Sequence, residues 1–442
     1  MLTTRWFRLV ILLTLILSLI LSACSALKKS GPVRLRLEVS LTPQELASFQ
    51  PALEALDQAH PEWEVALENV PQASVVEKIS TQLAGNTLPD VVRVQGLFTQ
   101  QWIRQNAFVD LTPYINQAGV DLNDFFPGPL EQFRWKDELW GLPDTAAPEV
   151  VFYNKAIFDA AGLPYPTDNW TYEDMRQAAL RLTLDSQGRN PGQAGFDPDS
   201  IQQWGWNSSL INFWQRYFVQ PFGADFCANA DCTLMNFTAP ETIAAVSWWA
   251  SLVNQDHAGL YDPYSGSQTG APGDPFISGK AALGSNGFFA VGQLNEAGNI
   301  SYDIVQPFLG QDGKRHTPLS TNGYVISARS AHVKEAWALV QALLDPQFLA
   351  DTWGKPGHSV PARRSVAASV LNPSHPPANQ QAIIAAMEYG EVFKPFTSSV
   401  FEVYGKTSDF FLKAMKGEMP VSEAMSQAEK TANEILARDR EP

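Results

Sequence analysis

The sequence is poor in the residues that build metal sites. It has three cysteines and six histidines among 442 residues, and the histidines stand singly, without a His-x-His or His-Glu-x-x-His pair. It also lacks the Gly-x-Ser-x-Gly turn of serine hydrolases and a glycine-rich phosphate loop. We therefore predict neither a metal nor a cofactor, and the motifs of these enzyme classes are missing.

Positive charge is also scarce. Lys and Arg number 31 against 46 Asp and Glu, which gives a formal net charge of -15. Such an acidic surface repels phosphate backbones, so a nucleic acid is not an expected partner. Hydrophobic residues make up 45% of the chain, an ordinary globular balance. Because 442 residues exceed what one hydrophobic core usually serves, two lobes or domains are predicted.

The apolar run near the N-terminus is short for a membrane span. It covers Leu9 to Leu21, thirteen residues, whereas a spanning helix needs about 20. Two arginines precede the run, so residues 1–23 are predicted to be an export signal. The Leu-Ser-Ala-Cys at its end resembles a bacterial lipobox, which predicts lipidation of Cys24, a tether over residues 24–32 and an anchor on the outer face of the cell membrane. An ordinary signal peptide with a chance cysteine is the alternative.

The other two cysteines, Cys227 and Cys232, are separated by four residues in a polar, turn-like stretch. Export places them in an oxidising compartment, which favours a local disulfide that closes a surface loop. A two-cysteine metal site is the weaker alternative, because no further ligands lie nearby in the sequence.

Strand and helix patterns alternate at the start of the predicted mature chain. Strands are expected at Val33–Val39, Trp63–Val70 and from Leu88 onward, with an amphipathic helix in each interval. This βαβαβ order indicates a parallel sheet with covering helices. Ligands of such sheets bind beyond the carboxyl ends of the strands, so Gln95 and Gln44 are candidate ligand contacts. The alternative for Gln95 is a solvated loop residue.

Several short motifs resemble those of one protein family, and they occur in that family's order. They are Leu88–Val92 (LPDVV), Phe108–Ile115 (FVDLTPYI), Phe152–Lys155 (FYNK), Trp170–Asp174 (WTYED), Phe276–Phe289 and Val360–Val366 (VPARRSV). Together they resemble extracellular solute-binding protein family 1, which includes maltose-binding protein. No single motif is specific, but the joint order extends over nearly the whole predicted mature chain.

The resemblance implies an α/β fold of the type II binding-protein class, with two lobes built from discontinuous chain. It places residues 33–145 and 306–348 in the first lobe, and residues 146–305 and 349–442 in the second. The implied crossings lie near Asp144 to Glu149, near Val305 and near Asp345 to Asp351.

The resemblance also implies a function. A protein of this kind captures a carbohydrate in the cleft between its lobes and delivers it to an ABC-transporter permease, as a monomer and without catalysis. One alternative is the same fold with another solute, such as a polyamine or glycerol phosphate. A secreted glycoside hydrolase is the rival class, because tryptophans and paired carboxylates are common to both.

Candidate ligand contacts follow from the motifs, each with a structural alternative. Asp144 and Glu149 are acids at the implied hinge, where they accept sugar hydroxyls or only hold the hinge. Trp206 is a stacking candidate that is otherwise a core residue. The remaining candidates are Phe289 with its neighbour Phe288, the amides of Asn322 and Gly323, and Arg363, for which a salt bridge is the alternative.

Overall fold

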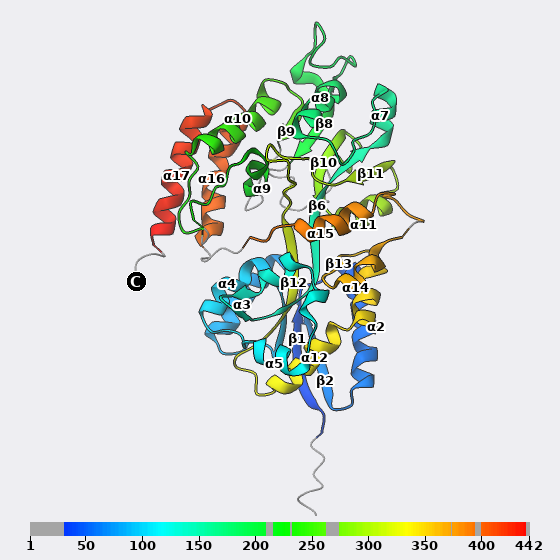
Figure 1. Ribbon diagram of the computed structural model, residues 1–442, viewed down its shortest axis with the longest axis vertical. Coiled ribbons are helices and arrows are strands. Elements are labelled where there is room, and N and C mark those ends of the chain that lie inside the picture. The colour runs from blue at the N-terminus through cyan, green and yellow to red at the C-terminus, as the bar shows by residue number, and fades with distance from the viewer. Residues whose placement is uncertain are drawn as a thin grey trace, which may run out of the picture.

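The computed structural model describes residues 31–208, 215–229, 232–261, 274–372, 374–393 and 399–438. These residues form two lobes of mixed helix and strand that follow one another along the long axis (Figure 1). The long strand β6 (Leu142–Asn154) runs from the first lobe into the second. The predicted two-lobed α/β fold is present.

The first lobe is built on a sheet in the order β2-β1-β3-β12-β6. Strand β1 is parallel to both β2 and β3, as the predicted βαβαβ opening requires, and β12 is antiparallel to β3. The elements of this lobe are β1 (Val33–Val39), α2 (Pro43–Ala59), β2 (Trp63–Asn69), α3 (Val75–Ala84), β3 (Val91–Gln95), α4 (Thr99–Arg104), α5 (Thr112–Ala118), α6 (Pro127–Gln132), β4 (Arg134–Trp135), β5 (Glu138–Leu139), β12 (Leu319–Ile326), α12 (Val333–Leu343) and α13 (Pro346–Leu349).

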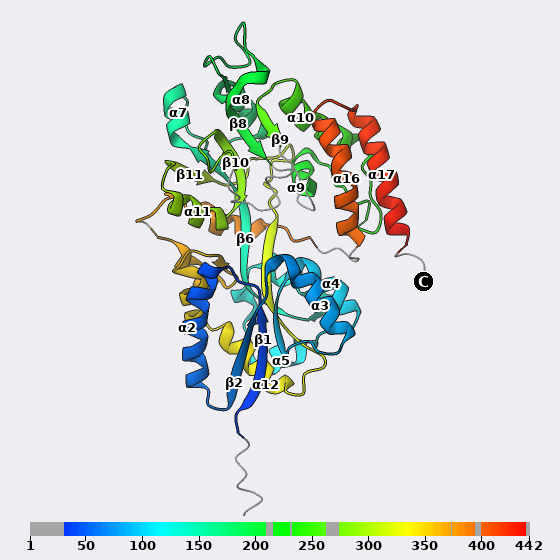
Figure 2. The same ribbon diagram turned by 180° about the vertical axis from the view of Figure 1, so that it is seen from behind.

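Local sequence signals explain why the first lobe forms. Thr42 caps α2 through a reciprocal capping box with Glu45, and Pro43 occupies the first helical turn. Phe49 and Leu53 of the same helix are buried against one face of the sheet together with α12. Helices α3 and α4 bury their apolar residues on the other face, so the sheet is covered on both sides (Figure 2).

The second lobe continues from the same strand. The later half of β6 pairs antiparallel with β10 and β11, and β10 is parallel to β8. Helices α8, α10, α16 and α17 contribute to the core on one face of this sheet, and α11 and α15 to the core on the other. The elements are α7 (Lys155–Ala161), α8 (Tyr172–Leu182), β7 (Leu184–Asp185), β8 (Ile201–Ser208), α9 (Gln215–Val219), α10 (Pro240–Asn254), β9 (Gly259–Tyr261), β10 (Ala281–Gly287), α11 (Phe289–Ala297), β11 (Tyr302–Val305), α15 (Gln381–Tyr389), α16 (Ser399–Met415) and α17 (Val421–Ala437).

Three chain segments meet where the lobes join. Besides β6, they are the linker between β11 and β12, which also crosses between the lobes, and the segment that follows α15 within the second lobe. Thr317 of the linker donates its hydroxyl to the carbonyl of Glu149 in β6 at 2.6 Å. The amide of Glu391, in the third segment, donates to the carbonyl of Thr317 at 2.8 Å. The three segments are thus hydrogen-bonded side by side, and two of them are crossings between the lobes.

The third crossing lies later in the chain than the sequence implied. Trp353, in the π-helical turn Ala350–Gly354, is fully buried in the core of the first lobe, in ring contact with Phe49. Strand β13 (Val360–Pro361) pairs with the first half of β6, and Val366 of α14 (Arg364–Ala367) still packs in the first lobe's core. The expected crossing near Asp345 to Asp351 is therefore wrong, because large apolar side chains beyond it bury in the first lobe.

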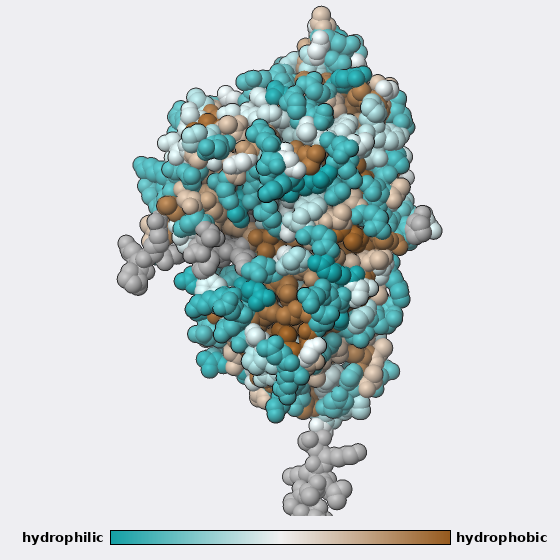
Figure 3. Space-filling model, in the orientation of Figure 1, coloured by the Kyte–Doolittle hydropathy of each residue, from teal (hydrophilic) through white to brown (hydrophobic). Residues whose placement is uncertain are grey.

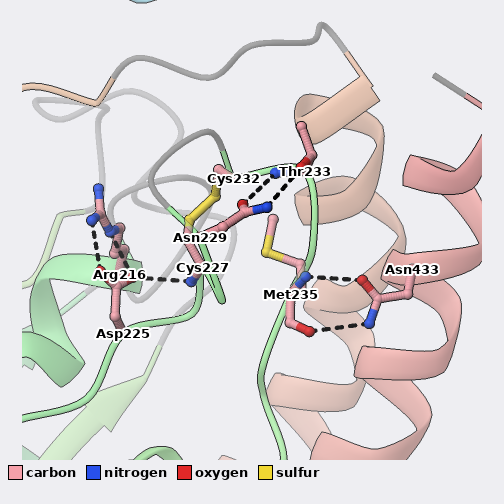
Figure 4. The surroundings of a disulfide bond; sticks show 8 residues. All are labelled: Arg216, Asp225, Cys227, Asn229, Cys232, Thr233, Met235 and Asn433. Carbon is pink, nitrogen blue, oxygen red and sulfur yellow. Dashed lines mark hydrogen bonds and ion pairs between the residues drawn. A yellow bond between two sulfur atoms is a disulfide. The ribbon is translucent and has the colours of Figure 1, made fainter. Parts of the chain in front are cut away.

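A disulfide joins Cys227 to Cys232, as expected from the sequence (Figure 4). Close to the disulfide, Asn433 of α17 exchanges two hydrogen bonds with the backbone of Met235. Arg216 forms an ion pair with Asp225, which lies two residues before Cys227. Within the described ranges, no helix combines the length and the apolar character needed to cross a membrane.

Candidate functional site at the lobe junction

Both lobes direct the carboxyl ends of their parallel strands toward the junction. Strand β3 ends at Gln95, which pairs with Asn322 near the start of β12. Strand β10 runs antiparallel to β6 and ends at Gly287, opposite Glu149. Since β6 ascends from the first lobe into the second, these two strand ends approach the same level from opposite sides. This is the edge where open α/β sheets bind ligands.

The edge of the first lobe carries amide side chains. Gln95 and Asn322 are adjacent in the sheet and partly exposed, and the Gln95 amide donates to the hydroxyl of Ser320 at 3.3 Å. Gln44 is exposed in the first turn of α2. On the face shown in Figure 3, apolar side chains gather over the first lobe just below the junction, amid mostly polar surface.

The edge of the second lobe carries an aromatic ring. Phe289, the first residue of α11, is 38% exposed, whereas its neighbour Phe288 is buried. The ring lies over Gly287, where an added Cβ would come within 2.2 Å of the Phe289 Cε1 atom. The glycine therefore makes room for the ring at the end of β10, and of the two predicted aromatics only Phe289 is open to a ligand.

A pocket lies in the second lobe beside the crossing segments, and we name it the Glu149 pocket. Its polar and aromatic lining includes Glu149, Tyr172, Trp206, Tyr217, Ser285 and His316. The Ser285 hydroxyl donates to the Glu149 carboxylate at 2.9 Å. Burial raises the pKa of Glu149 to about 6, and the hydrogen bond from Ser285 opposes this shift only in part.

His316 borders the same pocket from the linker. Its two ring nitrogens lie 3.1 Å from carboxylate oxygens of Glu391 and Asp312. The hydrogen bond to Glu391, and then that to Asp312, raise the pKa of His316 against the effect of burial. Two carboxylate acceptors require both ring nitrogens to donate, which favours the charged imidazolium.

Trp206 is not a ring exposed in an open cleft. It is 2% exposed and packs beside Trp249 and Phe308 in the core of the second lobe. Its indole nitrogen is buried and has no hydrogen-bond partner among the described residues, and the residue lines the Glu149 pocket. Trp206 is thus a core residue that also borders the pocket and has one polar atom left unpaired within the described ranges.

Asp144 does not face a ligand. It is fully buried, and its two carboxylate oxygens accept hydrogen bonds from Arg93 at 2.6 and 3.3 Å. The Arg93 guanidinium in turn lies over the Trp353 ring, 4.2 Å from the ring centroid. The hypothesis that Asp144 accepts sugar hydroxyls is therefore wrong, because Arg93 occupies its acceptors inside the first lobe.

Gly323 and Arg363 are also structural in their surroundings. A Cβ at Gly323 would meet the Leu142 carbonyl oxygen at 2.5 Å, so the glycine serves close packing in the core rather than ligand contact. Arg363 donates to Asp124 at 2.6 Å and to the Leu344 carbonyl oxygen at 3.0 Å. The salt bridge that the sequence left open for Arg363 is the one observed.

Some residues of the junction gave little sequence signal. Ser285, Thr317 and Tyr172 line the Glu149 pocket from a strand, a linker and the start of a helix. Ser285 had one local cue: it lies two residues past Leu283, and such residues share a face where the chain forms a strand. Cys24 lies outside the described residues. Within the described part of the chain, no group of three or more metal-ligating side chains comes together.

The two lobes, with the carboxyl ends of their strands at the junction, have the architecture of a two-lobed α/β binding protein. The solved structure of the sugar-binding protein MalE from Xanthomonas citri superposes with a TM-score of 0.76 at 20% identity, covering 92% of this chain and 98% of that one. An ABC substrate-binding protein from Listeria monocytogenes, in complex with cycloalternan, gives a TM-score of 0.75 at 20% identity, covering 92% and 99%. At this identity the likeness establishes the fold.

Residues 41–348 match the sequence model of the bacterial extracellular solute-binding proteins, and the chain belongs to this family. The erythritol/L-threitol-binding protein of Mycolicibacterium smegmatis is 24% identical over 298 residues, which span 63% of this chain and 60% of that protein. The maltotriose-binding protein of Pyrococcus abyssi is 22% identical over 308 residues, spanning 68% and 60%. The matched part is thus less than two thirds of the length of either relative.

Proposed function

We propose that this protein captures a neutral carbohydrate or polyol between its lobes and delivers it, unchanged, to an ATP-driven membrane permease. The observation that carries the proposal is the exposed ring of Phe289 at one strand edge and the partly exposed amides of Gln95 and Asn322 at the other. A sugar matches such a site because its C–H faces stack on an aromatic ring while its hydroxyls bind amides.

The net charge of the protein and the names of its relatives both support a neutral ligand. The net charge of -15 disfavours a phosphate ester. The relatives described above carry names that assign them a polyol or an oligosaccharide. In this proposal the ligand shifts the protein from an open to a closed population by bending the three crossing segments, and the permease recognises the closed form. Lipidation of Cys24 would keep the receptor at the membrane surface.

A ligand screen tests the proposal. Purified protein is heated with erythritol, mannitol, maltotriose, putrescine or glycerol phosphate, while tryptophan fluorescence reports the unfolding temperature. We expect a rise with at least one of the three neutral compounds, because a ligand that binds only the folded state stabilises it. The bound sugar should be recovered intact by chromatography. A response to putrescine or glycerol phosphate alone would refute the neutral-ligand proposal, and shortened sugar would indicate a hydrolase.

Two matched substitutions locate the site. Phe289 and Leu234 are the large apolar residues that are 38% exposed in the described part of the chain. Phe289→Ala should weaken binding of the responding sugar about tenfold, since it removes the stacking surface. Leu234→Ala removes a similar exposed side chain two residues after Cys232 and should leave the affinity unchanged. Equal affinities of both variants and the wild type would place the ligand elsewhere.

A further inference from the structure

The Glu149 pocket brings the Glu149 carboxylate and the indole N–H of Trp206, unpaired in the described part of the chain, to the same face of the second lobe's sheet. In the sheet register Val151 pairs with Ser285, and Leu283 pairs with Trp206. Because side chains alternate along a strand and paired residues share a face, Glu149, Ser285 and Trp206 project to the same side.

The Trp206 indole and the Glu149 carboxylate differ in hydrogen-bonding capacity: one donates and the other accepts. The Trp206 indole N–H is a donor only, and it is buried without a partner among the described residues. The Glu149 carboxylate is an acceptor, and its described hydrogen bond comes from Ser285. A buried N–H left unpaired costs free energy that an acceptor in the pocket would restore.

Three ligand chemistries can be compared against this pair. An ammonium group only donates, so it would satisfy Glu149 but leave the indole N–H unpaired. A carboxylate or phosphate only accepts, so it would satisfy the indole but meet the negative charge of Glu149. A hydroxyl both accepts and donates, and it alone satisfies both groups.

We propose that the Glu149 pocket is a subsite for one hydroxyl or hydroxymethyl group of a neutral polyol or sugar. The ligand oxygen accepts from the Trp206 indole N–H and donates to the Glu149 carboxylate. Aromatic side chains from α8 and α9 line the pocket and limit water, which strengthens both hydrogen bonds. This subsite rests on the proposed function and assigns to two named residues the recognition of one functional group.

The test uses three single variants of the full chain. Trp206→Phe removes the N–H and keeps an aromatic ring, and Glu149→Gln removes the charge and keeps the shape. Trp204→Phe is the matched control, because Trp204 lies on the same strand but packs against another core cluster of the lobe and does not line the Glu149 pocket. Affinities for erythritol, mannitol, maltotriose and putrescine are measured by titration calorimetry at pH 7.5, with an unfolding curve of each unliganded variant.

For the neutral compound that binds, we expect Trp206→Phe to weaken binding about 3- to 10-fold and Glu149→Gln about tenfold, with Trp204→Phe unchanged. The unliganded Trp206→Phe protein should be less stable than the wild type, because a smaller ring leaves a cavity in the core, but it loses no hydrogen bond to a described residue, since the N–H is unpaired there. A merely structural role would lower stability in this way without weakening the binding of the sugar to the folded variant, so the measured affinity separates the two roles.

Three results would overturn the subsite. If a neutral compound binds and both variants bind it like the wild type, the subsite is wrong while the proposed function stands. If putrescine binds, and Glu149→Gln abolishes this while Trp206→Phe does not, the pocket is an ammonium site. If none of the neutral compounds binds the wild type, the proposed function and the subsite fall together.

Discussion

Replacing Glu149 by glutamine should make the protein more stable at neutral pH. Burial raises the pKa of this carboxyl from 4.5 to about 6, against the single opposing hydrogen bond from Ser285. The folded protein thus holds the proton more tightly than the unfolded chain does. Between about pH 4.5 and 6 unfolding releases that proton, so the contribution of Glu149 to stability falls as the pH rises.

The size of the effect follows from the shift. A rise of about 1.5 pKa units corresponds to about 2 kcal/mol. This is an upper value, because part of the Glu149 side chain still touches solvent. Glu149→Gln removes the charge, so its free energy of unfolding should exceed that of the wild type by up to about 2 kcal/mol at pH 7.5 and by almost nothing at pH 4.5.

Urea denaturation followed by tryptophan fluorescence measures the difference at each pH. Other titratable groups at the pocket, Tyr172, Tyr217 and His316, are common to both proteins and cancel in the comparison. Ser285→Ala is a second test, since removing the donor should raise the pKa of Glu149 further and enlarge the pH dependence. A variant that is less stable than the wild type at pH 7.5, or a difference equal at both pH values, would refute the reasoning.

Two further predictions concern the cores of the lobes. Asp144→Asn should cost about 3–5 kcal/mol in urea denaturation, because it leaves the charge of Arg93 buried without its partner, and a loss below about 1 kcal/mol would contradict this view of the pair. Gly205→Ala should cost about 1–3 kcal/mol, since its Cβ would come within 2.1 Å of the Ala179 carbonyl oxygen. Gly292→Ala is the control: it lies in α11 with open space around it and should gain about 0.5–1 kcal/mol, and similar changes at both glycines would argue against the close contact.

The opening of the fold was predictable because its signals are local. The alternation of β1 and the capping box of α2 can be read from residues a few positions apart, and the parallel pairing with β2 and β3 follows from the order of elements. The third crossing was misplaced because no local sequence signal indicates that Trp353 is buried beside Phe49, about 300 residues earlier in the chain.

The site was less predictable because it depends on side-chain direction along a strand shared by two lobes. Asp144 and Glu149 lie five residues apart on β6, yet one enters the core of the first lobe and the other a pocket of the second. Asp144 is held in the core by an ion pair with Arg93, which lies 51 residues earlier in the sequence. Arg363 is fixed in the same way by Asp124, 239 residues away. Sequence pattern identifies such acids and bases, but only the fold assigns their partners.

The Glu149 pocket keeps two groups that weaken the unliganded fold. A carboxylate buried without a basic partner and an indole N–H without an acceptor each cost free energy that a glutamine and a phenylalanine would avoid. Both groups lie where the carbonyl of Glu149 accepts a hydrogen bond from Thr317 of the linker, at the point about which the lobes would move. A ligand hydroxyl there would relieve both costs at once and do so beside the hinge, so its binding energy is available to bias closure. The unliganded protein is less stable because of these two groups, and a ligand that pairs with them therefore changes the balance between its open and closed forms.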